Sequence, residues 1–130
     1  MSQTRTAATR PDQSGKPQRY VFVLLNNFTL LCFSAAVESL RIANRMAGRD
    51  LYEWRIIGEG GDTAVCSAGT AFKLDGDLEE LTRDDTVMVC GGIDVQDATS
   101  KRLLGWLRRE ARKGLQMGGL CTAAYSLARA

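Results

Sequence analysis

Residues 113–125 read KGLQMGGLCTAAY, and no other segment says more about the architecture of this chain. A short apolar stretch runs through small residues into Cys121, and a helix-forming sequence starts directly after it. Such a strand–turn–helix junction places a side chain at the carboxyl end of a parallel sheet, where open α/β folds bind ligands. The thiol of Cys121 is therefore either a nucleophile or the floor of a binding pocket.

The segments before this junction alternate in period between strands and helices. Continuous apolar runs at 20–25 and 86–90 are typical of strands that are covered on both faces. We expect a further strand at 52–58, helices at 34–47, 99–113 and 122–130, a small hairpin from 64–66 and 70–72, and a short helical turn at 77–81. This order predicts an α/β fold with a doubly wound, mostly parallel sheet.

The length of the chain and its two ends define the expected domain. A chain of 130 residues with 45% hydrophobic content can bury one core. Residues 1–19, which are rich in Thr, Ser, Gln, Pro and Arg, are predicted to be a disordered leader. The last predicted helix has no stopping Gly, Asn or Pro, and it needs a further strand to cover. We therefore expect residues 20–130 to be the N-terminal portion of a larger α/β domain.

Charge and hydropathy exclude several classes of function. The net charge is +2, but residues 1–19 hold four Lys or Arg and one Asp, so the positive excess lies in the leader. The rest of the chain then has no basic excess for binding nucleic acid, and the basic run 108–113, interrupted by Glu110, is interpreted as a solvated helix face. Neither a secretory signal nor a membrane span is found, which predicts a cytoplasmic protein without a membrane partner.

The cysteines point to reduced thiols. Cys32, Cys66, Cys90 and Cys121 form no Cys-x-x-Cys pair, and the chain has no His, so we expect no metal site and no cofactor. Cys32 and Cys90 are predicted at the carboxyl ends of strands, so they would share one rim with Cys121. This arrangement would suit a redox sensor. We favour the simpler explanation of small buried side chains, because Cys is among the most often buried residue types.

Three motifs in this order resemble a known superfamily. They are the segment 28–40, the turn Cys90-Gly91-Gly92, and the junction 119–122. They are similar to the ThiJ/PfpI, class I glutamine amidotransferase-like proteins, whose sheet is flavodoxin-like. Within that superfamily, residues 20–130 look like the N-terminal domain of AraC-type transcription regulators of glycine betaine, carnitine or arginine catabolism. The resemblance implies a small-molecule effector, a homodimer, and DNA binding through a helix-turn-helix region absent from this chain.

The chain departs from the enzyme pattern of the superfamily. Enzymes of this kind carry an acidic residue shortly after the first strand. When segment 28–38 is aligned with them by its Leu-Leu and Glu-x-Leu residues, Cys32 falls at that position. A base is also missing, because the chain has no His. A helix N-terminus lowers a thiol pKa but cannot shuttle protons. We therefore predict no catalytic residue, with Cys121 as a vestigial nucleophile. The alternatives are a cysteine-dependent hydrolase or amidase and, third, a chaperone or redox protein of this fold.

The predicted ligand-binding residues surround the junction: Asn27, Glu38, Gly91, Gly92, Cys121 and Thr122. The amides of Gly92 and Thr122 suit a ligand carboxylate, because helix starts bind anions. Glu38 offers a carboxylate to a quaternary ammonium or guanidinium group, although a surface charge at the first helix explains it equally well. A tight strand-exit turn would likewise explain the two glycines.

Overall fold

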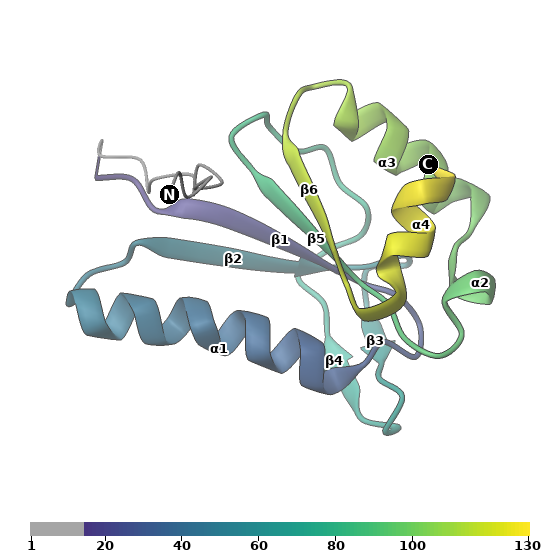
Figure 1. The fold of residues 1–130 in the computed structure, drawn as a ribbon, viewed down its shortest axis with the longest axis horizontal. Helices are drawn as coiled ribbons and strands as arrows, with labels where there is room; N and C mark the ends of the chain where they lie inside the picture. The colour runs from purple at the N-terminus through teal and green to yellow at the C-terminus, as the bar shows by residue number, and fades with distance from the viewer. Residues whose placement is uncertain (1–14) are drawn as a thin grey trace, which may run out of the picture.

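Four parallel strands form the central sheet of the computed structural model, which describes residues 15–130 (Figure 1). The first half of the chain contains β1 (Gln18–Leu24), α1 (Leu30–Ala47), β2 (Tyr52–Ile57), β3 (Thr63–Val65) and β4 (Ala71–Lys73). The second half contains β5 (Thr86–Cys90), α2 (Val95–Ala98), α3 (Lys101–Ala111), β6 (Gln116–Leu120), the 3-10 turn η1 (Cys121–Ala123) and α4 (Ala124–Arg129). Most of the predicted leader, residues 1–19, lies outside the described residues. Its last two residues, Gln18 and Arg19, belong to β1.

The strand order β2-β1-β5-β6 places β1 and β5 at the centre of the sheet. Alternate residues of these strands point into two different cores. The first core contains Val21 and Val87, together with α3 side chains. The second contains Phe22 and Cys90 and receives side chains from α1. In Figure 1, α1 covers one face of the sheet and α3 and α4 the other. This confirms the predicted doubly wound, mostly parallel α/β fold.

The second core fixes the loop that follows β1. The rings of Phe28 and Phe33 pack edge to face at 5.7 Å, and each also contacts Phe72 of β4. Phe22 of β1 packs against Phe33 at 5.5 Å. Edge-to-face pairs of buried aromatic rings stabilise packing beyond their buried area. This cluster therefore holds the start of α1 against the carboxyl end of the sheet.

Two large buried residues of α3 bind the segment before β5. Trp106 is 1% exposed, and its Nε1 donates a hydrogen bond to the carbonyl of Glu79 at 2.9 Å. Glu110 is also 1% exposed, accepts a hydrogen bond from the Leu81 amide, and pairs with Lys113. The predicted helical turn at 77–81 is wrong, because α3 side chains take up these backbone groups. In the basic run 108–113, Arg108, Arg109 and Arg112 are exposed as predicted, whereas the interrupting Glu110 is buried.

The start of α1 is the boundary that matters most for the site. The helix begins at Leu30, four residues before the predicted start, and ends at Gly48, whose φ of 67° gives the expected left-handed stop. Cys32 therefore lies in the first helical turn, and its predicted position at the end of a strand is wrong. Phe33 turns into the second core from the same turn.

The predicted helix 99–113 is present as α3, which is two residues shorter at each end. The short α2 precedes it, and α3 then starts after Ser100, whose hydroxyl caps the helix by accepting a hydrogen bond from the Leu103 amide at 2.9 Å. The hairpin of β3 and β4 and the strands β2, β5 and β6 lie where the sequence predicts them. These elements bring the loop after β1, the turn after β5 and the junction after β6 to one end of the sheet.

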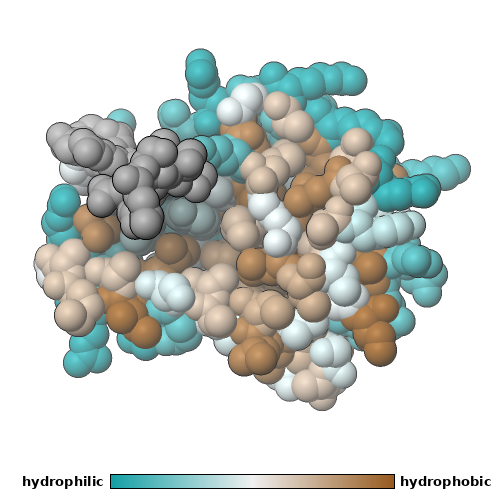
Figure 2. Space-filling view, in the orientation of Figure 1, coloured by the Kyte–Doolittle hydropathy of each residue, from teal (hydrophilic) through white to brown (hydrophobic). Residues whose placement is uncertain are grey.

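Figure 2 shows how side chains are distributed on the face seen in Figure 1. Apolar residues gather over the middle of this face, and hydrophilic residues lie around the periphery. β6 crosses the same region and lies at the edge of the described sheet, since it pairs with β5 alone among the described strands.

Candidate functional site

The junction between β6 and η1 presents an exposed thiol. Cys121 is the first residue after β6 and has a φ of 57°, a left-handed conformation that is uncommon for any residue but glycine. Such backbone conformations concentrate at functional sites, where the surrounding structure enforces them. The predicted strand–turn–helix junction is therefore present, and its side chain is accessible.

Three groups act on the sulfur of Cys121 and lower its pKa. The hydroxyl of Thr29 lies 3.4 Å from Sγ, and the amide of Thr122 and the thiol of Cys32 complete the set. The bond from Thr29, with those from Thr122 and Cys32, outweighs partial desolvation and holds the pKa of Cys121 below its ordinary value. The geometry therefore favours a thiolate at this position.

The Thr29 side chain contacts the Cys121 sulfur instead of capping α1. It occupies the N-cap position of α1, where a Thr side chain ordinarily accepts a hydrogen bond from an amide of the first turn. Here the side chain makes no capping bond, and its hydroxyl faces Cys121 instead. The first segment of α1 is thus tied to the β6 junction through this side chain.

The other cysteines differ from Cys121 in accessibility and acidity. Cys32 is partly buried, and burial, followed by the neighbouring Cys121, raises the pKa of its thiol. Burial raises the pKa of Cys90 to about 12. Cys66 is 1% exposed and lies in the second core. The structure brings Cys32 and Cys121 together, whereas Cys90 lies beneath the surface.

The two predicted glycines are required by the chain's own backbone. A Cβ atom at Gly92 would lie 2.0 Å from the carbonyl oxygen of Asn27, and one at Gly91 would lie 2.8 Å from the amide nitrogen of Ala123. The carbonyl of Gly92 accepts a hydrogen bond from the hydroxyl of Thr122 at 2.6 Å. The turn after β5 is therefore packed between the loop after β1 and the junction after β6.

Asn27 and Asp94 join two of these loops. Asn27 has a φ of 59°, and its side-chain amide donates a hydrogen bond to Asp94 at 2.6 Å. Asp94 is not among the predicted site residues, although it follows the Gly91-Gly92 turn by two positions. The carboxylate of Asp94 adds negative charge at this end of the sheet.

Glu38 is placed on α1, six residues beyond Cys32, which is about one and two-thirds helical turns. Its carboxylate accepts a hydrogen bond from Arg41 at 2.8 Å, and this bond lowers the pKa of Glu38. Half of the side chain is exposed. A cationic ligand at Glu38 would therefore have to compete with a guanidinium group on the same helix.

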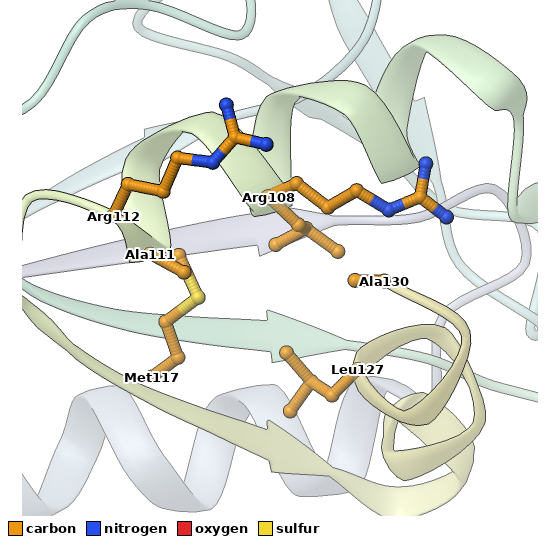
Figure 3. A pocket seen from close by; sticks show the side chains of 7 residues that line it. Arg108, Ala111, Arg112, Met117, Leu127 and Ala130 are labelled. Atoms are coloured by element: carbon orange, nitrogen blue, oxygen red, sulfur yellow. The ribbon is translucent and has the colours of Figure 1, made fainter.

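A separate groove lies beside β6, away from the thiols. It has a volume of about 440 Å³ and lies between α3, β6 and α4 (Figure 3). Met117 and Leu127 point into it, and the guanidinium groups of Arg108 and Arg112 lie along its α3 side.

Residues 15–130 contain neither a cluster suited to a metal ion nor a membrane-spanning helix. No group of three or more His, Cys, Asp or Glu side chains within residues 15–130 is placed to hold a metal ion. In the same range, no helix is both long enough and apolar enough to span a bilayer.

The fold has known counterparts among solved structures. A ThiJ/PfpI family protein from Pseudomonas syringae superposes with a TM-score of 0.69 at 14% identity, covering 99% of this chain and 52% of that one. A DJ-1 superfamily protein from Agrobacterium tumefaciens gives a TM-score of 0.63 at 20% identity, covering 85% of this chain and 56% of that one. The chain has the ThiJ/PfpI fold, as the sequence motifs indicate.

Sequence relatives define the class more closely, although no family model matches the chain. The HTH-type transcriptional regulator GbdR of Pseudomonas aeruginosa is 38% identical over 120 residues, covering 92% of this chain and 33% of the regulator. The regulator CdhR of the same species is 37% identical over 113 residues, covering 87% and 33%. The regulator GlxA of Rhizobium meliloti is 39% identical over 115 residues, covering 87% and 35%.

One solved structure is itself a transcriptional regulator and resembles this chain in both fold and sequence. An AraC family transcriptional regulator from Pseudomonas putida superposes with a TM-score of 0.71 at 26% identity, covering 85% of this chain and 60% of that one. The chain is thus a homologue of HTH-type transcriptional regulators, and the predicted resemblance to AraC-type regulators with a ThiJ/PfpI domain is confirmed. It spans about a third of the length of the curated relatives it matches.

Proposed function

We propose that this chain is a non-catalytic, small-molecule-sensing domain of a bacterial transcription regulator of the AraC type. The observation that carries the proposal is the set of three groups around Cys121. Thr29, Thr122 and Cys32 stabilise an anion but supply no proton acceptor, and the chain has no His. A hydrolase needs a general base beside its nucleophile. Homology to regulators supports the same conclusion.

The effector in this proposal is a quaternary amine or an amino acid. Its carboxylate would lie at the Thr122 and Gly92 end, where a short helix begins beside the exposed thiol. Its cationic group would be drawn to the carboxylates of Glu38 and Asp94. Asn27 and Gly91 would shape the loops between these two ends. Cys121 would then form the floor of the pocket.

Effector binding would act on DNA indirectly. The proposed regulator is a homodimer, and an effector that prefers one arrangement of the dimer shifts the population toward it. A helix-turn-helix region outside this chain would contact the DNA. Such a protein works in the cytoplasm.

Thermal denaturation of the full-length protein tests the proposal. Glycine betaine, carnitine and arginine are the candidate effectors, and choline is the control, because it keeps the quaternary amine but lacks the carboxylate. A true effector at 100 times its Kd stabilises the folded state by about 2.7 kcal/mol. We expect a rise in Tm with at least one candidate and none with choline. Unchanged Tm values with all candidates would contradict the proposal.

Two substitutions separate the effector site from general stability. Glu38→Gln should weaken the response to the effector, because it removes the charge facing the cationic group. Glu53→Gln is the matched control, since Glu53 is exposed on β2. Equal effector responses in the two variants would remove Glu38 from the site.

A cysteine-dependent hydrolase or amidase is the second candidate. The exposed thiol of Cys121, its left-handed backbone and its lowered pKa favour this reading. It requires that Cys121→Ser abolish turnover of amide or ester substrates by the full-length protein. Turnover that survives this substitution, or none in the unmodified protein, supports the regulator.

A further inference from the structure

Two thiols meet where α1 begins beside the β6 junction. Thr29 contacts Cys121 through its hydroxyl, and Cys32 follows Thr29 by three positions, so that it lies on the same side of the helix. The two thiols also act on each other, because Cys32 lowers the pKa of Cys121 and Cys121 raises that of Cys32. Residues far apart in the sequence thus form an adjacent dithiol.

The two thiols of this pair have unequal surroundings. Cys121 is exposed, and its sulfur accepts hydrogen bonds from its neighbours. Cys32 is partly buried and is one of the groups that lower the pKa of Cys121. The thiolate is the form of cysteine that reacts with oxidants and electrophiles, so Cys121 is the member of the pair that reacts first. The thiol of Cys32, whose pKa is raised, lies beside Cys121.

We propose that Cys121 and Cys32 form a reversible intramolecular disulfide on exposure to hydrogen peroxide, with Cys121 oxidised first and Cys32 resolving it. This inference is independent of the proposed effector, because it depends on the dithiol alone. In a sensor it would also lock α1 against the floor of the effector pocket. The regulator would then respond to oxidation through the same site.

The chemistry balances in two steps. The Cys121 thiolate attacks one oxygen of hydrogen peroxide, the O–O bond breaks, and the leaving hydroxide takes up a proton to form water. Cys121, oxidised by two electrons, now carries a sulfenic acid. The sulfur of Cys32 attacks the sulfenic sulfur, the S–S bond forms, and the S–O bond breaks. The departing hydroxide leaves with the Cys32 proton as a second water.

The sequence allows a direct assay, because each cysteine falls on its own tryptic peptide: residues 20–41, 56–73, 84–101 and 114–129. The reduced full-length protein is treated with equimolar hydrogen peroxide, its free thiols are alkylated in denaturant, and it is digested without reductant. We expect peptide 20–41 joined to peptide 114–129, with a mass two hydrogens below their sum. Dithiothreitol should separate them. Cys66 and Cys90 should be found alkylated.

Three variants assign the roles. Cys32→Ser should leave Cys121 as a sulfenic acid that dimedone traps, and Cys121→Ser should leave Cys32 alkylated after peroxide. Cys90→Ala is the control and should keep the disulfide, with circular dichroism checking the fold of each variant. Alkylation of both Cys32 and Cys121 in the peroxide-treated protein, or a disulfide from Cys121 to any other cysteine, would overturn the proposal.

Discussion

One hydroxyl group contributes most to the acidity of Cys121. The hydrogen bond from Thr29 is the largest influence that lowers the pKa of this thiol. Thr29→Val keeps the shape of the side chain and removes the donor, so the pKa of Cys121 should rise. We expect the pH at which iodoacetamide alkylates Cys121 at half its maximal rate to move upward in this variant.

A second threonine provides the comparison for Thr29. Thr70→Val changes an exposed residue in the turn before β4 and should leave the alkylation profile of Cys121 where it is in the unmodified protein. An unchanged profile in Thr29→Val would show that the hydroxyl does not act on the sulfur.

Gly92 and Gly105 should respond in opposite ways to a single methyl group. A Cβ at Gly92 would overlap the Asn27 carbonyl oxygen at 2.0 Å, whereas one at Gly105 in α3 meets nothing within 4 Å. Gly92→Ala should cost roughly 3 kcal/mol or more of unfolding free energy, since backbone must move. Gly105→Ala should stabilise by about 0.5–1 kcal/mol, because Ala has the higher helix propensity. Urea denaturation measures both.

The outcome that contradicts this packing is equally simple. A Gly92→Ala protein with unchanged stability would mean that the turn after β5 does not lie against the loop after β1. The site would then be more open than the structure describes.

Among the elements, β1 is tied to the segment before β5 by one ion pair. Arg19 pairs with Asp85 at 2.8 Å, and Asp85 is 4% exposed. Burial disfavours the charged carboxylate, but hydrogen bonds from Arg19 and Thr82 outweigh it, so the pKa of Asp85 lies below its ordinary value. Arg19→Ala leaves this buried acceptor without its main partner and should cost roughly 1–3 kcal/mol at neutral pH.

The sign of the pH dependence follows from the lowered pKa. The pair stabilises the fold fully above the ordinary carboxyl pKa of about 3.9, and this contribution is lost as the pH falls through the lower value of the folded state. The stability curves of Arg19→Ala and the unmodified protein should therefore converge in acid. Arg83→Ala, at an exposed position nearby, should follow the unmodified protein throughout. A constant difference at every pH would contradict this account.

Elements with a clear period were predictable from the sequence, and those whose geometry depends on tertiary contacts were not. The apolar strands β1 and β5 and the Cys121 junction follow from local pattern. The start of α1 did not, because residues 30–33 are nearly all apolar and carry no helical period. Because the predicted helix started too late, Cys32 was wrongly predicted to lie at the end of a strand. Segment 77–81 was misjudged because distant α3 side chains bind its backbone.

The candidate site was predictable in part for the same reason. Cys121 and the Gly91-Gly92 turn come from local motifs, and the structure places them together with Asn27 and Thr122. Thr29 and Asp94 carry no motif of their own, since their roles arise from loops that meet only in the folded chain. The effector roles of Glu38 and the other predicted residues stay predictions.

On the scale of the whole molecule, two cores share one sheet. Trp106 belongs to the first core, and Trp54 packs against the second. Because β1 and β5 contribute side chains to both cores, neither core can be lost while the sheet persists. The domain should therefore unfold in one cooperative transition.

Two single-tryptophan variants measure that cooperativity. Trp54→Phe leaves the fluorescence of Trp106, and Trp106→Phe leaves that of Trp54. Each variant should give the same urea midpoint by fluorescence as by far-ultraviolet circular dichroism. A fluorescence midpoint that differs from the circular dichroism midpoint of the same variant would mean that the cores unfold separately.

The N-terminus of α1 reports on the state of the sulfur. Thr29 directs its hydroxyl to Cys121, so the first-turn amides of α1 lack the side-chain acceptor that an N-cap ordinarily gives them. We expect oxidation or alkylation of Cys121 to weaken the contact between its sulfur and the Thr29 hydroxyl, which would free the hydroxyl to cap the helix. Deuterium uptake at those amides should therefore change with the chemical state of Cys121, which lies on a different element, η1. Hydrogen exchange at the first turn of α1 is thus expected to report whether the Cys121 thiol is unmodified.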